Sequence, residues 1–154
     1  MSRNGGEGYM GVQELYDQAV ELLAKRDYSS GDLRYQLSRL AESDTVEQVM
    51  EKLLSHHYVN DERLIEREIE KQLLKRHGSA RIKQELRKKG LDSLLIEQAL
   101  EDLDVDWFEL CLEAKQKKFG EAKPRDMNEK GKMIRYLQYR GHAMSCIMET
   151  LSDS

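Results

Sequence analysis

The sequence is short of the residues that interrupt helices, cross-link chains or enter membranes. Pro124 is the one proline among 154 residues, so long helical stretches are permitted. Cys111 and Cys146 are too few and too far apart for a disulfide framework, and we expect free thiols in a reducing cytoplasm. No apolar run approaches the roughly 20 residues of a membrane span, and no signal-peptide pattern opens the chain. We therefore expect a cytoplasmic protein that does not enter a membrane.

The sequence also lacks the spacings on which catalysis and metal binding depend. Gly131 and Lys132 have no upstream glycine at the spacing of a phosphate-binding loop. His56 and His57 would point about 100° apart on a helix, which prevents them from sharing a metal. No histidine pair stands at i and i+4, and no Cys-x-x-Cys motif exists. We expect no enzyme, no metal and no cofactor.

The charge of the chain is abundant and unevenly distributed. Residues 66–90 and residues 112–142 each carry nine Lys and Arg against four Asp and Glu. The remainder carries seven positive and 21 negative side chains, so the net charge of −4 hides two basic stretches. Basic stretches suit an anionic polymer or an acidic protein groove, and the acidic parts suit a basic surface.

A helical pattern nearly repeats itself about every 50 residues. The segment Leu33–Leu37 returns as Ile82–Leu86 and again as Met133–Leu137, with apolar residues at both ends each time. Such a period is typical of stacked units, none of which can bury its apolar face alone. Apolar residues at helical spacing and the lack of any convincing strand predict an all-α fold. We expect three tandem three-helix repeats that form an elongated, curved molecule.

The expected limits of these parts follow from composition and capping residues. Residues 1–11 are rich in glycine and are expected to be a disordered lead-in, followed by repeats over 12–60, 61–105 and 106–154. The expected helix starts include Ser29 or Ser30, Asp61, Ser79 and Asp106, and the expected helix ends include Gly90 and Gly141. In the third repeat we expect a mobile loop over Glu121–Asn128 and then a helix over Lys130–Arg140.

Two groups of side chains on the predicted middle helices are candidate partner-binding surfaces. The group of the second repeat comprises Lys75, Arg76, Arg81, Lys83, Arg87 and Lys88, with Lys89 beside them. The group of the third repeat comprises Lys132, Arg135, Tyr136, Tyr139 and Arg140. Tyrosine and arginine are favoured in interface hot spots, and both stack on bases. The plainer alternatives are that the cations form a solvated face and that Tyr136 covers the core beside Leu137.

The basic helix before Gly90 and the helix after it resemble a helix-turn-helix DNA reader. The segment after Gly90 is acidic, however, because it carries Asp92, Glu97, Glu101 and Asp102. Phosphate would repel a recognition helix with these charges. The repeats explain the helices without groove reading.

Several motifs resemble those of the RecX regulators of the bacterial recombinase RecA, over about Leu15–Leu151. The most specific is Tyr58–Leu64, similar to the Tyr-Leu-Asp-Asp-x-Arg-Phe junction between the repeats of that family. The basic stretch Lys75–Gly90 is also similar, as are Lys117–Gly120 and Lys130–Gly141. The first repeat is the least family-like.

The resemblance implies three tandem three-helix repeats and binding to RecA nucleoprotein filaments, along the groove or at a growing end. It also implies inhibition of filament extension, ATP hydrolysis, strand exchange and the co-protease activity that triggers the SOS response. A second hypothesis is a helical protein that binds single-stranded DNA directly and competes with RecA, and contact with double-stranded DNA stays open. A third is an enzyme with an unrecognised site. We expect a monomer.

Overall fold

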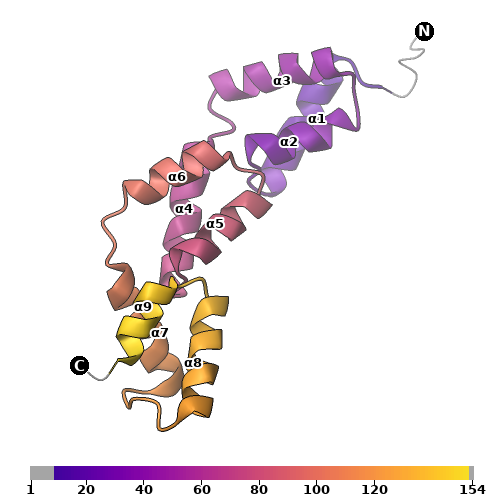
Figure 1. Ribbon diagram of the computed structural model, residues 1–154. Helices are drawn as coiled ribbons and strands as arrows, with labels where there is room; N and C mark the ends of the chain where they lie inside the picture. The colour runs from indigo at the N-terminus through magenta and orange to yellow at the C-terminus, as the bar shows by residue number, and fades with distance from the viewer. Residues whose placement is uncertain (1–8, 153–154) are drawn as a thin grey trace. The chain divides into compact units, whose positions relative to one another are not determined.

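The computed structural model describes residues 9–152, which form nine α-helices and no strand (Figure 1). The helices are α1 (Val12–Lys25), α2 (Ser30–Ser38), α3 (Ser43–Ser55), α4 (Asp61–Leu74), α5 (Ser79–Lys88), α6 (Ser93–Glu101), α7 (Trp107–Phe119), α8 (Met127–Tyr139) and α9 (Met144–Leu151). The prediction of an all-α fold of three-helix repeats is confirmed. Within the same residues no helix is long and apolar enough to cross a membrane.

The disordered lead-in predicted for residues 1–11 falls mostly on residues 1–8, which lie outside the described residues. Of the remaining three residues, Met10 is held against the first repeat. Its backbone N–H donates to the carbonyl of Leu40 at 2.9 Å, and its side chain packs against the core of that repeat.

Most predicted helix starts are correct, and one is displaced by a residue. Ser29 and Asp106 cap α2 and α7, each accepting the backbone N–H three residues further on at 3.0 Å. The prediction for Asp61 is wrong, because Asn60 accepts the N–H of Arg63 at 3.1 Å and Asp61 is the first residue of α4. The Asp61 carboxylate is used elsewhere, in a contact between repeats.

The loop of the third repeat is shorter than predicted, because α8 begins at Met127 instead of Lys130. Asp126 caps the helix by accepting the N–H of Glu129 at 2.8 Å. The preceding loop is organised around Lys115, a side chain that is only 2 % exposed. Its Nζ donates to the carbonyls of Gly120 and Ala122, each at 2.7 Å.

The chain divides into two compact units. The first comprises Met1–Ile65 with Lys88–Asp92, and the second comprises Glu66–Arg87 with Ser93–Ser154. In the first unit, α1 and α2 pack against α3 (Figure 1). The buried residues of this core are Leu15, Ala19, Leu33, Leu37, Ala41, Val46, Val49, Met50, Leu53 and Val59. Their burial removes the apolar stripe of each helix from water and stabilises the unit.

In the second unit, α7 and α8 pack against α9. The buried residues of this core are Cys111, Ala114, Met133, Leu137, Ile147 and Leu151. Phe119 and Tyr136 close one side of it, with their rings in an edge-to-face contact at 5.4 Å between centroids. Lys75 and Arg76, from the connection between α4 and α5, line a pocket together with Ala114 and Tyr136 of this core.

Candidate functional site

The second unit joins the start of α5 directly to the end of α8 through backbone hydrogen bonds. The N–H of Gly78 donates to the carbonyl of Arg140 at 2.8 Å, and the N–H of Ala80 donates to the carbonyl of Gly141 at 3.2 Å. Helix starts leave N–H groups without partners inside the helix, and helix ends leave carbonyls, so each end satisfies the other. The approach is close because a Cβ on Gly78 would lie 2.3 Å from the Gly141 carbonyl oxygen.

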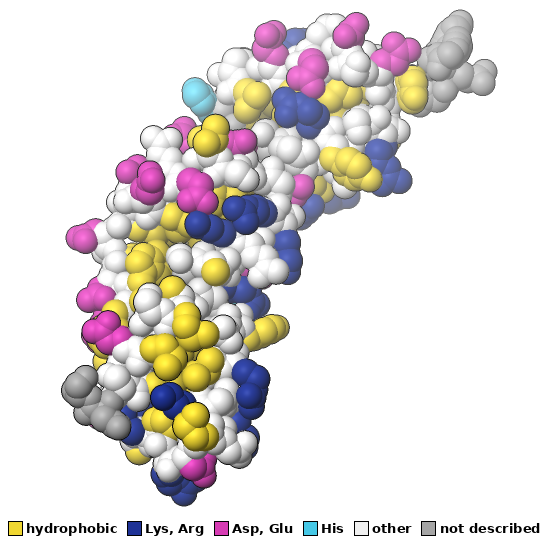
Figure 2. Space-filling model, in the orientation of Figure 1, with side chains coloured by type: hydrophobic (Ala, Val, Ile, Leu, Met, Phe, Trp, Pro, Cys, Tyr) yellow, Lys and Arg dark blue, Asp and Glu magenta, His cyan; other side chains and the backbone are white. Residues whose placement is uncertain are grey.

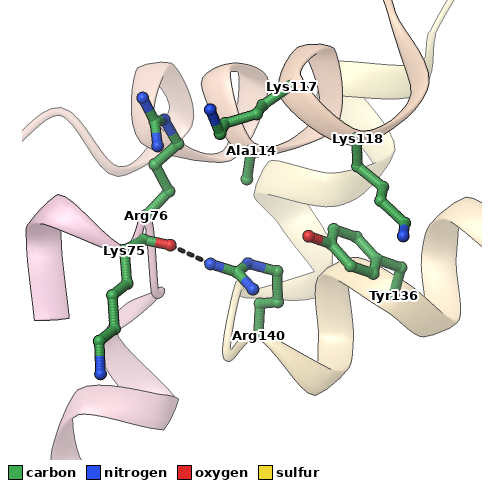
Figure 3. A pocket seen from close by; sticks show the side chains of 7 residues that line it. All are labelled: Lys75, Arg76, Ala114, Lys117, Lys118, Tyr136 and Arg140. Atoms are coloured by element: carbon green, nitrogen blue, oxygen red, sulfur yellow. Dashed lines mark hydrogen bonds between the residues drawn. The ribbon is translucent and has the colours of Figure 1, made fainter.

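Two side chains from the end of α8 extend this contact to the α4–α5 connection. The Arg140 guanidinium donates to the carbonyl of Lys75 (Figure 3). The His142 imidazole Nε2 lies 2.9 Å from the carbonyl of Arg76. Both carbonyls belong to the turn that follows α4, so the third repeat fixes the backbone from which Lys75 and Arg76 project.

A buried polar chain supports the same turn from within α4. His77 contacts the side-chain oxygen of Gln72 through Nδ1, and the Gln72 amide donates to the Glu68 carboxylate at 3.1 Å. Burial, with the nearby charges of Arg140, Arg81 and Lys75, lowers the pKa of His77 to about 4. Burial also lowers the pKa of His142. His77 is therefore neutral at neutral pH, and its Nδ1–H can donate to Gln72.

These contacts frame an open basic pocket of about 400 Å³. Its lining residues come from the α4–α5 turn, α7 and the α8 end, and they are Lys75, Arg76, Ala114, Lys117, Lys118, Tyr136 and Arg140 (Figure 3). None of these seven is acidic. The Lys118 ammonium and the Arg140 guanidinium each lie 5.5 Å from the centre of the Tyr136 ring. The arrangement can bind an anion or an anionic surface.

Four of the side chains predicted from the sequence therefore meet in the pocket: Lys75, Arg76, Tyr136 and Arg140. Tyr136 also packs against the core that contains Leu137, as the plainer alternative predicted, and it lines the pocket as well. Lys117 and Lys118 belong to a family-like run, but they were not among the binding residues predicted from the sequence. Their signal was the adjacent lysine pair at the end of an expected helix.

Three other predicted cations of α5, namely Arg81, Lys83 and Arg87, are engaged with neighbouring groups of the same unit. Arg81 pairs with Glu85 at 3.0 Å and donates to the Tyr139 carbonyl at 3.2 Å. Lys83 and Arg87 both approach the Glu97 carboxylate of α6, at 3.1 and 3.9 Å. These cations do not line the pocket, and they form ion pairs with neighbouring carboxylates. Lys88, the last residue of α5, is exposed and lies outside the pocket.

Three predicted residues of α8 form an exposed strip outside the pocket: Lys132, Arg135 and Tyr139. Tyr139 is 75 % exposed, and the Arg81 guanidinium lies 5.1 Å from its ring centre. Figure 2 shows Lys and Arg side chains gathered along the α5 and α8 side of this unit. Asp and Glu side chains gather over α6 and the connection to α7. The charge separation seen in the sequence is thus also a separation of surfaces.

Within residues 9–152 no group of three or more His, Cys, Asp or Glu side chains is arranged to hold a metal ion. The pocket presents cations and a tyrosine, which suit the binding of an anionic group.

Comparisons with known proteins identify the repeats. The second three-helix domain of RecX matches residues 60–100, and the third three-helix domain matches residues 104–151. Proteins named "Regulatory protein RecX" from Salmonella paratyphi A and Salmonella typhimurium LT2 are each 38 % identical over 146 residues, which cover 88 % of this chain and of theirs. A crystal structure of RecX from Lactobacillus salivarius has a TM-score of 0.75 at 20 % identity, over 90 % of this chain and 93 % of that one. A second crystal structure, of regulatory protein RecX, has a TM-score of 0.75 at 19 % identity, over 93 % of this chain and 73 % of that one. The fold agrees with these structures, and the sequence shows that this chain belongs to the RecX family of regulatory proteins.

Proposed function

We propose that this protein binds RecA nucleoprotein filaments and inhibits their recombinase, ATPase and co-protease activities without catalysing a reaction itself. The observation that carries the proposal is the 38 % identity to a protein named regulatory protein RecX over 88 % of both chains. The two matched RecX domains, over residues 60–100 and 104–151, include the residues of the basic pocket. Regulation of a filament requires a binding surface and no reacting group, and an array of helical repeats supplies such a surface.

The separated charges of the second unit support a large, charged partner. The basic side of α5 and α8 suits acidic protein surface or bound DNA, and the acidic side over α6 suits basic surface (Figure 2). We propose the exposed strip of Lys132, Arg135 and Tyr139 and the basic pocket as the contact surface. Arg81, Lys83 and Arg87 then act mainly through the internal pairs that hold α5 in place.

Direct binding of single-stranded DNA is the second candidate, favoured by one specific observation. The exposed ring of Tyr139, beside the Arg81 guanidinium, offers a face on which a base can stack. Binding to free DNA in the absence of RecA, with a steep dependence on salt, supports this candidate.

ATP hydrolysis by RecA on single-stranded DNA, titrated with this protein, tests the main proposal. We expect inhibition by the wild type, and the double variant Lys132→Glu, Arg135→Glu should need about tenfold more protein for the same effect. The matched control is Lys25→Glu, Lys52→Glu, which makes the same charge change on exposed lysines of α1 and α3.

Thermal unfolding of each variant shows that the charge changes leave the fold intact. Unchanged hydrolysis at excess wild-type protein, with active RecA and DNA, contradicts the proposal. Equal loss of inhibition in the two double variants removes the second unit as its contact surface.

A further inference from the structure

Few of the cations in the basic pocket are paired with carboxylates, in contrast to the cations on the rest of the α5–α8 surface. On α5, Lys83 reaches Glu97 at 3.1 Å and Arg81 reaches Glu85 at 3.0 Å. In the pocket, the one ion pair among the described residues joins Arg76 to Glu113 at 3.8 Å, and the Glu113 side chain is 49 % exposed. Such a long, solvated pair is weak, so the pocket keeps a strong positive potential.

Arg140 is held in position at the edge of the pocket. Its guanidinium donates to the Lys75 carbonyl and lies beside the Tyr136 ring, toward whose hydroxyl end it faces (Figure 3). The Nε of Arg140 is buried and has no hydrogen-bond partner among the described residues. The guanidinium of Arg140 lines the pocket, and an arginine fork is well suited to oxygen atoms of a phosphate.

Arg76 occupies a backbone conformation that favours glycine. Its φ is +61°, at the turn where its N–H bonds to Leu73 and the N–H of His77 bonds to Gln72. This is the usual end of a helix by a left-handed residue, and glycine is the residue that adopts it without strain. An arginine there places a cation at a turn for which glycine would be the unstrained residue. That side chain extends from the turn toward α7 (Figure 3).

Lys117 and Lys118 stand at the rim of the pocket, in the last turn of α7. Both are exposed, and in Figure 3 Lys117 extends toward Arg76 whereas Lys118 extends toward Tyr136. The pocket thus combines the arginines of the α4–α5 turn and the α8 end with the long lysines of α7. Arginine supplies directed hydrogen bonds to phosphate oxygens, and lysine supplies point charges that attract them.

We propose that this pocket is a phosphate-binding site, and that its ligand is a phosphate group of a nucleic-acid strand. A strand, more than an acidic peptide, fits a pocket that pairs cations with a tyrosine and lies on the helix that carries the exposed Tyr139. The chemistry is shared by free nucleotides, which the experiment separates. The inference rests on the second candidate of the proposed function, direct binding of single-stranded DNA, and it is tested without RecA.

The decisive variant is Arg76→Gly, which removes a cation and relieves the left-handed strain together. We expect the melting temperature to stay the same or rise, while the Kd for a fluorescein-labelled thymidine oligonucleotide, measured by anisotropy, increases about fivefold. The double variant Lys117→Gln, Lys118→Gln should increase the Kd by about tenfold. A merely structural role of Arg76 would move stability and affinity in the same direction.

The matched control is His57→Gly, because His57 has φ +60° at the end of α3 and lies in the other unit. It should leave the oligonucleotide Kd unchanged, as should Lys25→Gln, Lys52→Gln. Wild-type affinity in both pocket variants overturns the proposal.

Competition identifies the ligand chemistry. ATP or inorganic phosphate that displaces the oligonucleotide from the wild type but not from Arg76→Gly supports the phosphate site. Tighter binding of ATP than of the oligonucleotide keeps the site and assigns it to free nucleotides. Polyglutamate is compared with ATP at the same total concentration of negative charge. If polyglutamate displaces the oligonucleotide as effectively as ATP does, the site binds acidic protein and the proposal is overturned. If the pocket variants lose oligonucleotide binding but still inhibit RecA, the phosphate site is supported and the pocket is removed from the contact surface proposed for RecA.

Discussion

The middle helices of the first two repeats, α2 and α5, each begin in close contact with a glycine at the end of the next repeat's middle helix. The side chains around these two contacts carry opposite charge. In the first unit the start of α2 meets Gly90, and in the second the start of α5 meets Gly141. A Cβ on Gly31 would lie 2.5 Å from the Gly90 carbonyl oxygen, much as one on Gly78 would crowd Gly141. Both contacts are therefore backbone against backbone, which only glycine permits.

The side chains around the two contacts differ in charge. In the first unit the Asp61 carboxylate accepts the N–H and the hydroxyl of Ser30, at 2.8 and 2.6 Å. In the second unit Arg140 and His142 reach backbone carbonyls instead, and a basic pocket opens beside them. The comparison teaches that the repeat conserves its geometry through glycine, while the surrounding side chains are free to acquire a binding role.

The largest expected effect distinguishes crowding from backbone strain. Gly141 has φ +93°, and a Cβ there would lie 2.3 Å from the backbone N of Arg81. We expect Gly141→Ala to lower the free energy of unfolding by about 3 kcal/mol, as strain and overpacking add. At Gly90, φ is +76° and the nearest atom is the flexible Asp32 carboxylate, 2.4 Å away, so Gly90→Ala should cost about 1–2 kcal/mol. Urea unfolding measures both.

Gly120→Ala is the control for strain alone, because φ is +83° and nothing lies within 4 Å of its Cβ. It should cost about 1 kcal/mol. If Gly141→Ala and Gly120→Ala lose equal stability, the close approach of α5 and α8 contributes nothing and the comparison fails.

Low pH should destabilise the contact between α5 and Gly141 and leave the contact between α2 and Gly90 unchanged. The pKa of His77 is about 4 in the folded protein and 6.5 when unperturbed, so between these values the unfolded chain binds the extra proton. Stability therefore falls as pH drops from 6.5 to 4, by on the order of 2 kcal/mol, and His142 adds to the same trend. Urea titrations of wild type and His77→Gln across this range should show a shallower decline in the variant.

His56→Gln is the matched control, since His56 is exposed in the first unit. Its pH profile should follow that of the wild type. If the stability of all three proteins falls equally with pH, protonation of the His77 imidazole does not destabilise the fold, which would contradict the prediction.

The smallest effect concerns the first contact. Asp61→Asn keeps the shape of the side chain but removes the charge that strengthens both bonds from Ser30, and we expect a loss of about 1 kcal/mol. Glu62→Gln, an exposed neighbour in the same turn of α4, should change stability very little. Equal stability of Asp61→Asn and the wild type would show that backbone contact alone holds α2 to its neighbour.

The helices could be predicted from the sequence because apolar periodicity reports burial directly. The exact starts were harder, since Asn60 and Asp61 are adjacent polar residues that can both cap a helix. Which one does so depends on Ser30, 31 positions away, and that contact exists only in the folded repeat. For α8, the cap at Asp126 was hidden within the stretch expected to be a loop.

The candidate site was only partly visible for a similar reason. Charge density marked Lys75, Arg76 and Arg140, but the contribution of α7 depends on how three helices converge. The pairing of Lys83 with Glu97 of α6 likewise depends on neighbouring helices and not on sequence distance. Sequence predicts which residues are cationic; tertiary structure decides which of these cations meet a carboxylate.

Lys115 carries a consequence of a chemical kind. An amine that is 2 % exposed and bonded to two loop carbonyls is shielded from acylating reagents, and burial lowers its pKa. It therefore reacts far more slowly than the exposed amines of Lys117 and Lys118 on the same helix. Acylation of Lys115 requires that its hydrogen bonds to the loop carbonyls break first. The rate of acylation at this nitrogen therefore reports how often the loop of the third repeat opens.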